Sequence, residues 1–186
     1  MEQRETIADP YKILIDGCLE KKRIAQRQMY ERLASKMYPV CVRYVGDREL
    51  AKDVLHDGFI TLFSKLDTYK GIGSFEGWAR KIFVNTALMQ LRRDDVLKFS
   101  QELDSALPLQ STLGLAMENL ETRTLLNIIM GMPAGYRTVF NMYAIEGYSH
   151  SEIAKALGIS EGGVRSQFSR ARIWLQERLR RENYGR

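Results

Sequence analysis

The stretch that decides the fold reads SHSEIAKALGISEGGVRSQFSRARIWLQERL over residues 149–179. Ser149 and Glu152 have the S-x-x-E spacing of a capping box, which favours a helix that begins at this point. Gly158 can adopt the left-handed backbone that ends such a helix, and Ser160 is a suitable N-cap for the next one. The pattern predicts a helix-turn-helix, in which a short helix, a glycine turn and a longer second helix follow one another.

The second helix of this motif has one apolar face and one polar, basic face. Its apolar residues recur at helical spacing at Val164, Phe168, Ala171, Leu175 and Leu179. The other faces carry Arg165, Ser166, Ser169, Arg170 and Arg172. A helix fits the major groove of DNA, where Arg can bond guanine and Ser can bond bases or phosphates. We therefore predict that this helix binds DNA; the alternative is an amphipathic helical hairpin with a solvated basic face.

Two glycines, Gly162 and Gly163, fall in the first turn of the proposed DNA-binding helix. Glycine is unfavourable inside a helix because its backbone loses more freedom on folding than that of other residues. Two explanations remain open from the sequence. Either the backbone approaches DNA closely at this point, or the helix begins later than the cap at Ser160 indicates.

Upstream of the motif, helical spacing predicts two groups of helices that are separated by a polar segment. The first group comprises helices over residues 11–18, 22–44, 47–66 and 74–93, and the second begins with helices over residues 120–131 and 132–147. The fold class is thus all-α, with two small helical domains over residues 1–94 and 120–186 joined by a flexible linker over residues 95–119. In the helix that ends near Arg93 we expect a buried stripe of Phe75, Trp78, Ala79, Ile82, Phe83 and Met89.

Charge and composition limit the classes of function that the chain can have. The net charge of the 186 residues is +5, divided into +4 over residues 1–94, −3 over 95–130 and +4 over 131–186. Two basic lobes suit a polyanion such as nucleic acid, although a solvated surface explains them equally well. The chain has no long apolar run, so we expect neither a signal peptide nor a membrane span, and we predict a cytoplasmic protein.

Nothing in the sequence indicates catalysis, a cofactor or a metal. The two cysteines, Cys18 and Cys41, lack metal-binding spacing and are expected to be free thiols, and His56 and His150 are isolated. There is no P-loop, dinucleotide fingerprint or nucleophile motif. We therefore expect a protein that is not an enzyme and binds no cofactor.

Two segments resemble a known family when they are taken together. Residues 51–93 read AKDVLHDGFITLFSKLDTYKGIGSFEGWARKIFVNTALMQLRR, and residues 132–172 read MPAGYRTVFNMYAIEGYSHSEIAKALGISEGGVRSQFSRAR. They resemble regions 2 and 4 of extracytoplasmic-function (ECF) sigma factors, the small two-domain class of bacterial transcription initiation factors. The resemblance spans residues 20–94 and 120–180.

The resemblance implies a role for each group of candidate residues. Region 2 of the family docks on the coiled coil of the polymerase β′ subunit, here through Asp53, His56 and Asp57. The loop 68–74 and the helix after it imply recognition and melting of the −10 element by Tyr69, Lys70, Arg80, Lys81 and Asn85. Region 4 implies recognition of the −35 element by Arg165, Ser166, Ser169, Arg170 and Arg172. His56, Met89 and Gln167 stand where the family often has Gln, Asp and Arg.

These roles predict an alternative sigma factor that binds core RNA polymerase through the β′ coiled coil and the β subunit. It would direct the enzyme to −35/−10 promoters and help to open the DNA. We expect it to be a monomer when free, and an anti-sigma factor is a partner that members of the family often have. The alternative is a helix-turn-helix regulator that never docks on polymerase; such a protein would bind duplex DNA tightly by itself.

Overall fold

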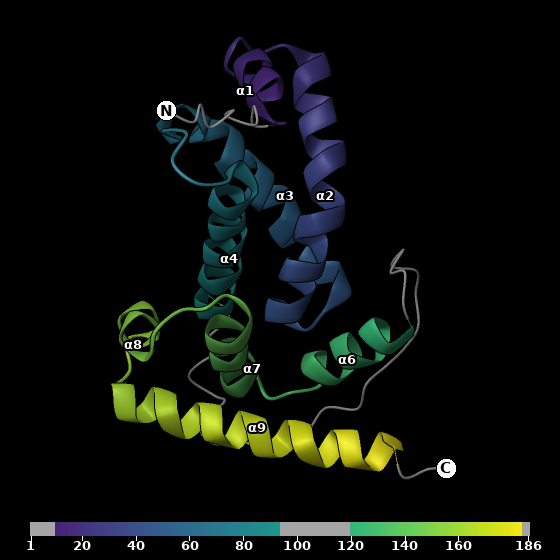
Figure 1. Ribbon diagram of the computed structural model, residues 1–186, viewed down its shortest axis with the longest axis vertical. Helices are drawn as coiled ribbons and strands as arrows, with labels where there is room; N and C mark the ends of the chain where they lie inside the picture. The colour runs from purple at the N-terminus through teal and green to yellow at the C-terminus, as the bar shows by residue number, and fades with distance from the viewer. Residues whose placement is uncertain (1–9, 94–119, 184–186) are drawn as a thin grey trace, which may run out of the picture. The chain divides into compact units, whose positions relative to one another are not determined.

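The computed structural model describes residues 10–93 and 120–183, and the regular elements in these ranges are all helices, without a strand (Figure 1). The predicted all-α class is confirmed, whereas the predicted linker lies outside the described residues. The first helices are α1 Lys12–Leu19, α2 Arg23–Val45, α3 Arg48–Ser64, the 3-10 turn η1 Leu66–Thr68 and α4 Phe75–Arg93. They are followed by α6 Leu120–Met130, α7 Ala134–Phe140, the π-helix η2 Asn141–Ile145, α8 His150–Leu157 and α9 Glu161–Asn183.

Contacts divide the chain into two compact units. Unit 1 comprises residues 1–41 and 49–87, and unit 2 comprises residues 42–48 and 88–186. The division differs from the domain limits expected from the sequence, because contacts assign the end of α2, the turn after it and the end of α4 to unit 2.

Unit 1 is built on buried side chains from its three longer helices. Met29 and Leu33 of α2, Leu62 of α3 and Phe83 of α4 are completely inaccessible to solvent. The packing of α3 on α4 depends on Gly58, because a Cβ at this position would lie 2.3 Å from Cδ1 of Phe83. Gly58 therefore allows the ring of Phe83 to lie directly against the backbone of α3.

Unit 2 is built on α9, which α6, α7 and α8 all contact (Figure 1). The buried face of α9 contributes Val164 and Ala171, and the neighbouring elements contribute Val139, Met142 and Ile153 to the same core. This face is the one that the spacing of apolar residues predicted. Because it is fixed in the core, the orientation of the opposite, polar face of α9 is fixed as well.

The guanidinium of Arg137 is buried in unit 2. Its Nη1 donates hydrogen bonds to the carbonyl oxygens of Met130 at 2.9 Å and of Met132 at 2.8 Å, at the end of α6. Desolvation by burial lowers the pKa of Arg137 to about 10. At neutral pH the side chain therefore keeps its charge and supplies donors to carbonyl groups that a helix end leaves without partners.

Two expectations about the helices were wrong in detail. The helix predicted over residues 132–147 is α7 followed by a π-helix, in which the amide of Glu146 donates to the carbonyl of Asn141 at 2.9 Å. Met89, expected in the buried stripe of α4, is 63% exposed, and Leu88 and Leu91 are buried there instead. The spacing of apolar residues identifies which face of a helix is buried. It does not show that a different face becomes buried near the end of the helix, as happens at Leu88 and Leu91.

Candidate functional site

The helix-turn-helix is held by the caps that its sequence predicts. The Ser149 side chain accepts a hydrogen bond from the amide of Glu152, whose carboxylate accepts one in return from the amide of Ser149 at 2.8 Å. Gly158 ends α8 with a φ of +70°. The hydroxyl of Ser160 accepts a hydrogen bond from the amide of Gly163 at 3.0 Å. These contacts confirm the capping box, the left-handed turn and the second cap.

All five predicted −35 residues lie exposed on α9. They are Arg165, Ser166, Ser169, Arg170 and Arg172. Arg165 forms an ion pair of 3.5 Å with Glu161, and Arg170 donates a hydrogen bond of 3.4 Å to the hydroxyl of Tyr136. Tyr136 was not predictable as a neighbour of this face, because nothing in its sequence context shows that it lies next to the exposed face of α9.

The glycine pair at the start of α9 has no packing role. The helix begins at Glu161, so the explanation that it begins later is wrong. A Cβ at Gly162 would lie 3.8 Å from Oγ of Ser160, and one at Gly163 would lie 3.4 Å from the same atom. Alanine therefore fits at both positions, and the two glycines leave the backbone of the first turn uncovered.

An aromatic group joins the π-helix to both helices of the motif. The ring of Tyr143 stacks on His150 at the start of α8, with centroids 4.5 Å apart and planes 9° apart. The same ring lies 4.6 Å from Phe168 of α9, measured between centroids. The π-turn thus supplies the side chain that spaces α8 and α9.

The three predicted docking residues share one face of α3 in unit 1. Asp53, His56 and Asp57 are all exposed, and Phe59 behind them is buried. Ile60 continues this face one turn further and is 56% exposed. The result is an acidic surface with an apolar residue at one end.

The candidates for −10 recognition differ in their accessibility. Lys70 on the loop is exposed, as are Lys81 and Asn85, which lie one turn apart on α4. Arg80 is half-buried, and its charge helps to lower the pKa of Glu76. Tyr69 is half-buried, and its ring lies on Phe75 and Trp78.

Glu76 links three helices beneath the loop 69–74. Its carboxylate accepts hydrogen bonds from Lys36 of α2 and, at 2.6 Å, from the hydroxyl of Tyr11, which lies just before α1. These bonds, first the one from Lys36, hold the pKa of Glu76 below its usual value. Burial, together with the bond to Glu76, raises the pKa of Tyr11.

Trp78 packs within the same region rather than standing free. Its ring lies 5.5 Å from Phe75 and 5.4 Å from Tyr69, measured between centroids. The ring of Phe75 is only 1% exposed. Trp78 itself is half-buried, so it packs on core side chains but does not have the fully buried position expected for it in the stripe of α4.

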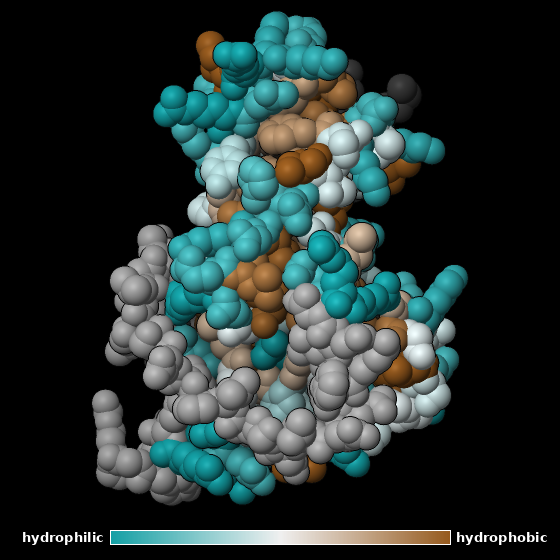
Figure 2. Space-filling view, turned by 180° about the vertical axis from the view of Figure 1, so that it is seen from behind, coloured by the Kyte–Doolittle hydropathy of each residue, from teal (hydrophilic) through white to brown (hydrophobic). Residues whose placement is uncertain are grey.

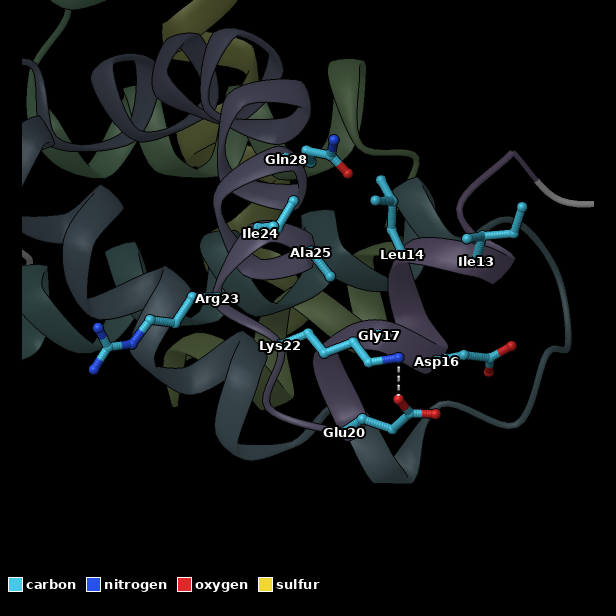
Figure 3. Close-up of a pocket in the computed structure, with 10 residues that line it drawn as sticks. All are labelled: Ile13, Leu14, Asp16, Gly17, Glu20, Lys22, Arg23, Ile24, Ala25 and Gln28. Carbon is cyan, nitrogen blue, oxygen red and sulfur yellow. Dashed lines mark ion pairs between the residues drawn. The ribbon is translucent and has the colours of Figure 1, made fainter.

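An open pocket of about 680 Å³ lies between α1 and α2, and none of the candidate residues lines it (Figure 3). Ile13, Leu14, Ile24 and Ala25 supply apolar walls, and Lys22 forms an ion pair with Glu20 at its edge.

On the face of unit 1 seen in Figure 2, hydrophilic residues cover most of the surface and hydrophobic ones form separate patches. The surface there is thus mixed rather than one apolar face.

Three further observations concern the described ranges only. They contain no group of three or more His, Cys, Asp or Glu residues placed to hold a metal ion. Within them, no helix has the length and apolar character that a membrane span requires. Cys18 and Cys41 are both buried, and neither forms a disulfide.

Comparison with known proteins gives two family matches in the predicted order. The family described as "Sigma-70 region 2" matches residues 29–96, and "Sigma-70, region 4" matches residues 122–175. The chain is 30% identical over 155 residues to the RNA polymerase sigma-H factor of Pseudomonas aeruginosa. This match covers 77% of the chain and 80% of that relative. It is 26% identical over 160 residues to the ECF sigma factor SigW of Bacillus subtilis, covering 78% and 83%.

A solved structure has the same fold. The sigma factor RpoE of Bartonella quintana, crystallised with the anti-sigma factor NepR, superposes with a TM-score of 0.54 at 20% identity. The match covers 83% of this chain and 96% of RpoE. Sigma factors are initiation factors rather than enzymes, and they work with RNA polymerase at promoter DNA. The capped helix-turn-helix, the two family matches and these relatives together place the chain in the ECF group of the sigma-70 family, as an alternative sigma factor.

Proposed function

We propose that the exposed face of α9 reads the −35 element through Arg165, Ser166, Ser169, Arg170 and Arg172. The observation that carries this proposal is the orientation of α9: Val164 and Ala171 are completely buried, so the arginine and serine side chains face away from the core. Early residues of such a helix meet base edges in the major groove. The uncovered backbone at Gly162 and Gly163 supports a close approach of the first turn to DNA.

The acidic face of α3 docks on core polymerase in this proposal. Asp53, His56 and Asp57 are exposed together on one face, and Phe59 fixes that face by burying the opposite side of the helix. The binding surface on the polymerase is the coiled coil of the β′ subunit, and unit 2 contacts the β subunit. An apolar residue beside acidic ones, as Ile60 is here, suits an interface that combines charge with desolvated contact.

The loop 69–74 and α4 read and open the −10 element. Lys70, Lys81 and Asn85 offer exposed donors for phosphates and bases. Arg80 is held near Glu76, so we assign it to the edge of this surface. Tyr69 belongs to the same loop, and its ring lies on Phe75 and Trp78.

The organisation proposed from the sequence completes this assignment. Residues 1–94 dock on polymerase and open the −10 element, residues 95–119 link, and residues 120–186 read the −35 element. The protein acts in the cytoplasm and is a monomer when free. A relative of the same fold is bound by the anti-sigma factor NepR, which supports a similar inhibitory partner for this chain.

Charge reversal on α3 tests the docking proposal. Asp53→Lys and Asp57→Lys together should abolish copurification with core RNA polymerase from the bacterium that encodes the chain, because like charges then face the coiled coil. Asp67→Lys, an exposed reversal on η1, is the matched control and should leave binding intact. Circular dichroism should show the same helix content in all variants. Unchanged copurification of the double variant would remove this face as the dock.

A further inference from the structure

The loop between η1 and α4 displays an isolated apolar side chain at its tip. Ile72 is 82% exposed, among the highest values for a large hydrophobic residue in the part of the chain that the structure describes. It stands between Gly71 with a φ of +71° and Gly73 with a φ of +75°, which are conformations that suit glycine. A Cβ at either glycine would meet nothing within 4 Å. Ile72 therefore stands clear of the protein and adds nothing to its core.

This loop is nevertheless held firmly at its base. The hydroxyl of Tyr69 donates a hydrogen bond of 2.9 Å to the carbonyl oxygen of Gly73. This bond joins the two sides of the loop below its tip at Ile72. The Tyr69 ring lies edge-on to Phe75, with centroids 5.2 Å apart and planes 72° apart. Since Phe75 is buried, the bond and the ring contact tie both ends of the loop to the core of unit 1.

An aliphatic side chain on a braced loop beside Lys70 is suited to one task at DNA. It cannot bond base edges, but it can enter an opened base step and replace part of the stacking that the step has lost. Proteins that deform DNA use Ile, Leu, Met, Phe and Pro as such wedges. Lys70, exposed next to it, can hold the phosphate backbone at the same place.

We propose that Ile72 inserts between bases of the −10 strand as it opens, and that Tyr69 is a positioning residue that holds the loop rather than a DNA contact. The inference rests on the proposed role of this loop in −10 opening. It assigns different work to neighbouring residues: Ile72 stabilises the opened step, Lys70 binds the backbone and Tyr69 sets the shape of the loop. Because isoleucine cannot read base edges, this contact discriminates little among bases at the opened step.

Promoter opening by the holoenzyme, formed from core polymerase and the full chain, tests the proposal. The probes are the strongest promoter selected by the wild-type holoenzyme, as a duplex with 2-aminopurine in the −10 element, and the same DNA with mismatches that open this element beforehand. Ile72→Ala should slow opening of the duplex about tenfold, because a wedge that offsets unstacking is lost. It should weaken binding to the pre-opened DNA by a similar factor, because the wedge contacts the opened step in both complexes, and Ile72→Leu should act like wild type on both.

Two further variants separate the roles. Lys70→Ala should weaken binding to both probes alike, because a phosphate contact is needed on each. Tyr69→Phe removes the hydroxyl that closes the loop and should slow duplex opening, but the double variant with Ile72→Ala should be no slower than Ile72→Ala alone. Additive effects in the double variant would contradict the positioning role of Tyr69.

Other outcomes overturn the wedge. Wild-type rates of duplex opening by Ile72→Ala, or wild-type binding of that variant to the pre-opened DNA, would show that Ile72 does not stabilise the opened step. Weaker binding to core polymerase with normal opening would assign Ile72 to a protein surface instead. Failure of the wild-type holoenzyme to open any promoter would contradict the proposed function itself, not the role of this residue.

Discussion

At the scale of single residues, Arg165 and Arg170 are the most direct test of how α9 meets DNA. Both are exposed, and replacement by alanine removes donors without opening a cavity in the core. Each change should weaken −35-dependent transcription by about 1–3 kcal/mol if the side chain reads a base. Run-off transcription on matched promoters with intact and scrambled −35 elements measures this loss.

The matched control lies on the same helix. Arg180 is exposed in the last part of α9, so Arg180→Ala removes the same charge at a distance from the first turns. It should leave the preference for the intact −35 element unchanged. Normal transcription in both the Arg165 and Arg170 variants would show that the exposed face of α9 does not recognise the −35 element.

Alanine substitutions at Gly58 and at Gly162 should change the free energy of unfolding in opposite directions. Gly58→Ala would place a Cβ 2.3 Å from the Phe83 ring and should lower the free energy of unfolding by about 1–3 kcal/mol through overpacking. Gly162→Ala meets nothing closer than 3.8 Å and should raise it by up to about 1 kcal/mol, since alanine favours a helix. Urea denaturation measures both. Equal stability of the two variants would contradict the close packing of α3 on α4.

The sequence predicted single residues best where a cap or a turn has a fixed chemistry. The capping box at Ser149, the left-handed Gly158 and the cap at Ser160 are present as expected. The roles of Tyr136 and Ile72 escaped notice, because each depends on what lies near it in space rather than on its neighbours along the chain.

At the scale of elements, Glu76 joins α4 to α2 and to the start of α1, and this link depends on pH. Its lowered pKa means that the folded state is favoured above pH 4.5, the ordinary value, and that this contribution disappears as the pH falls through the folded-state pKa. Glu76→Gln should therefore lower the free energy of unfolding by under about 1 kcal/mol at pH 7, because the group is partly exposed. The loss should be smaller at pH 3.5, where the wild-type carboxylate is partly protonated. Urea denaturation at both pH values measures the difference.

Glu31→Gln is the control for that experiment. Glu31 pairs with Arg27 within α2, and both side chains are exposed, so its replacement should change stability less than Glu76→Gln at pH 7. A cost of Glu76→Gln that is the same at pH 7 and pH 3.5 would contradict the link between the three helices.

Element boundaries were predictable from spacing as long as the helix stayed regular. The predicted 22–44 and 74–93 agree with α2 and α4 to within a residue at each end. The π-turn at Asn141–Ile145 was not foreseen, because it ends the helix and no helical residues follow it in which a shift of the apolar spacing would show. Its consequence is functional, since it brings Tyr143 between His150 and Phe168.

At the scale of the whole molecule, the order of the parts carries more information than any one of them. A helix-turn-helix by itself predicts a regulator that finds DNA unaided. Joined to the docking face proposed on α3 and the loop proposed to open DNA before α4, it predicts a factor whose two DNA-binding surfaces act only when polymerase holds them. The family was therefore recognisable from the sequence, whereas the identity of each contact residue depends on complexes with polymerase and promoter.

Run-off transcription from a library of duplex promoters, with purified core polymerase and the full chain, tests this central claim most directly. Transcripts should require both core polymerase and the chain and should start downstream of one promoter class with paired −35 and −10 elements. The chain alone should show little binding to the same duplexes. Tight binding by the chain alone, with no new transcripts when core polymerase is added, would contradict the account and favour a regulator that works without polymerase docking.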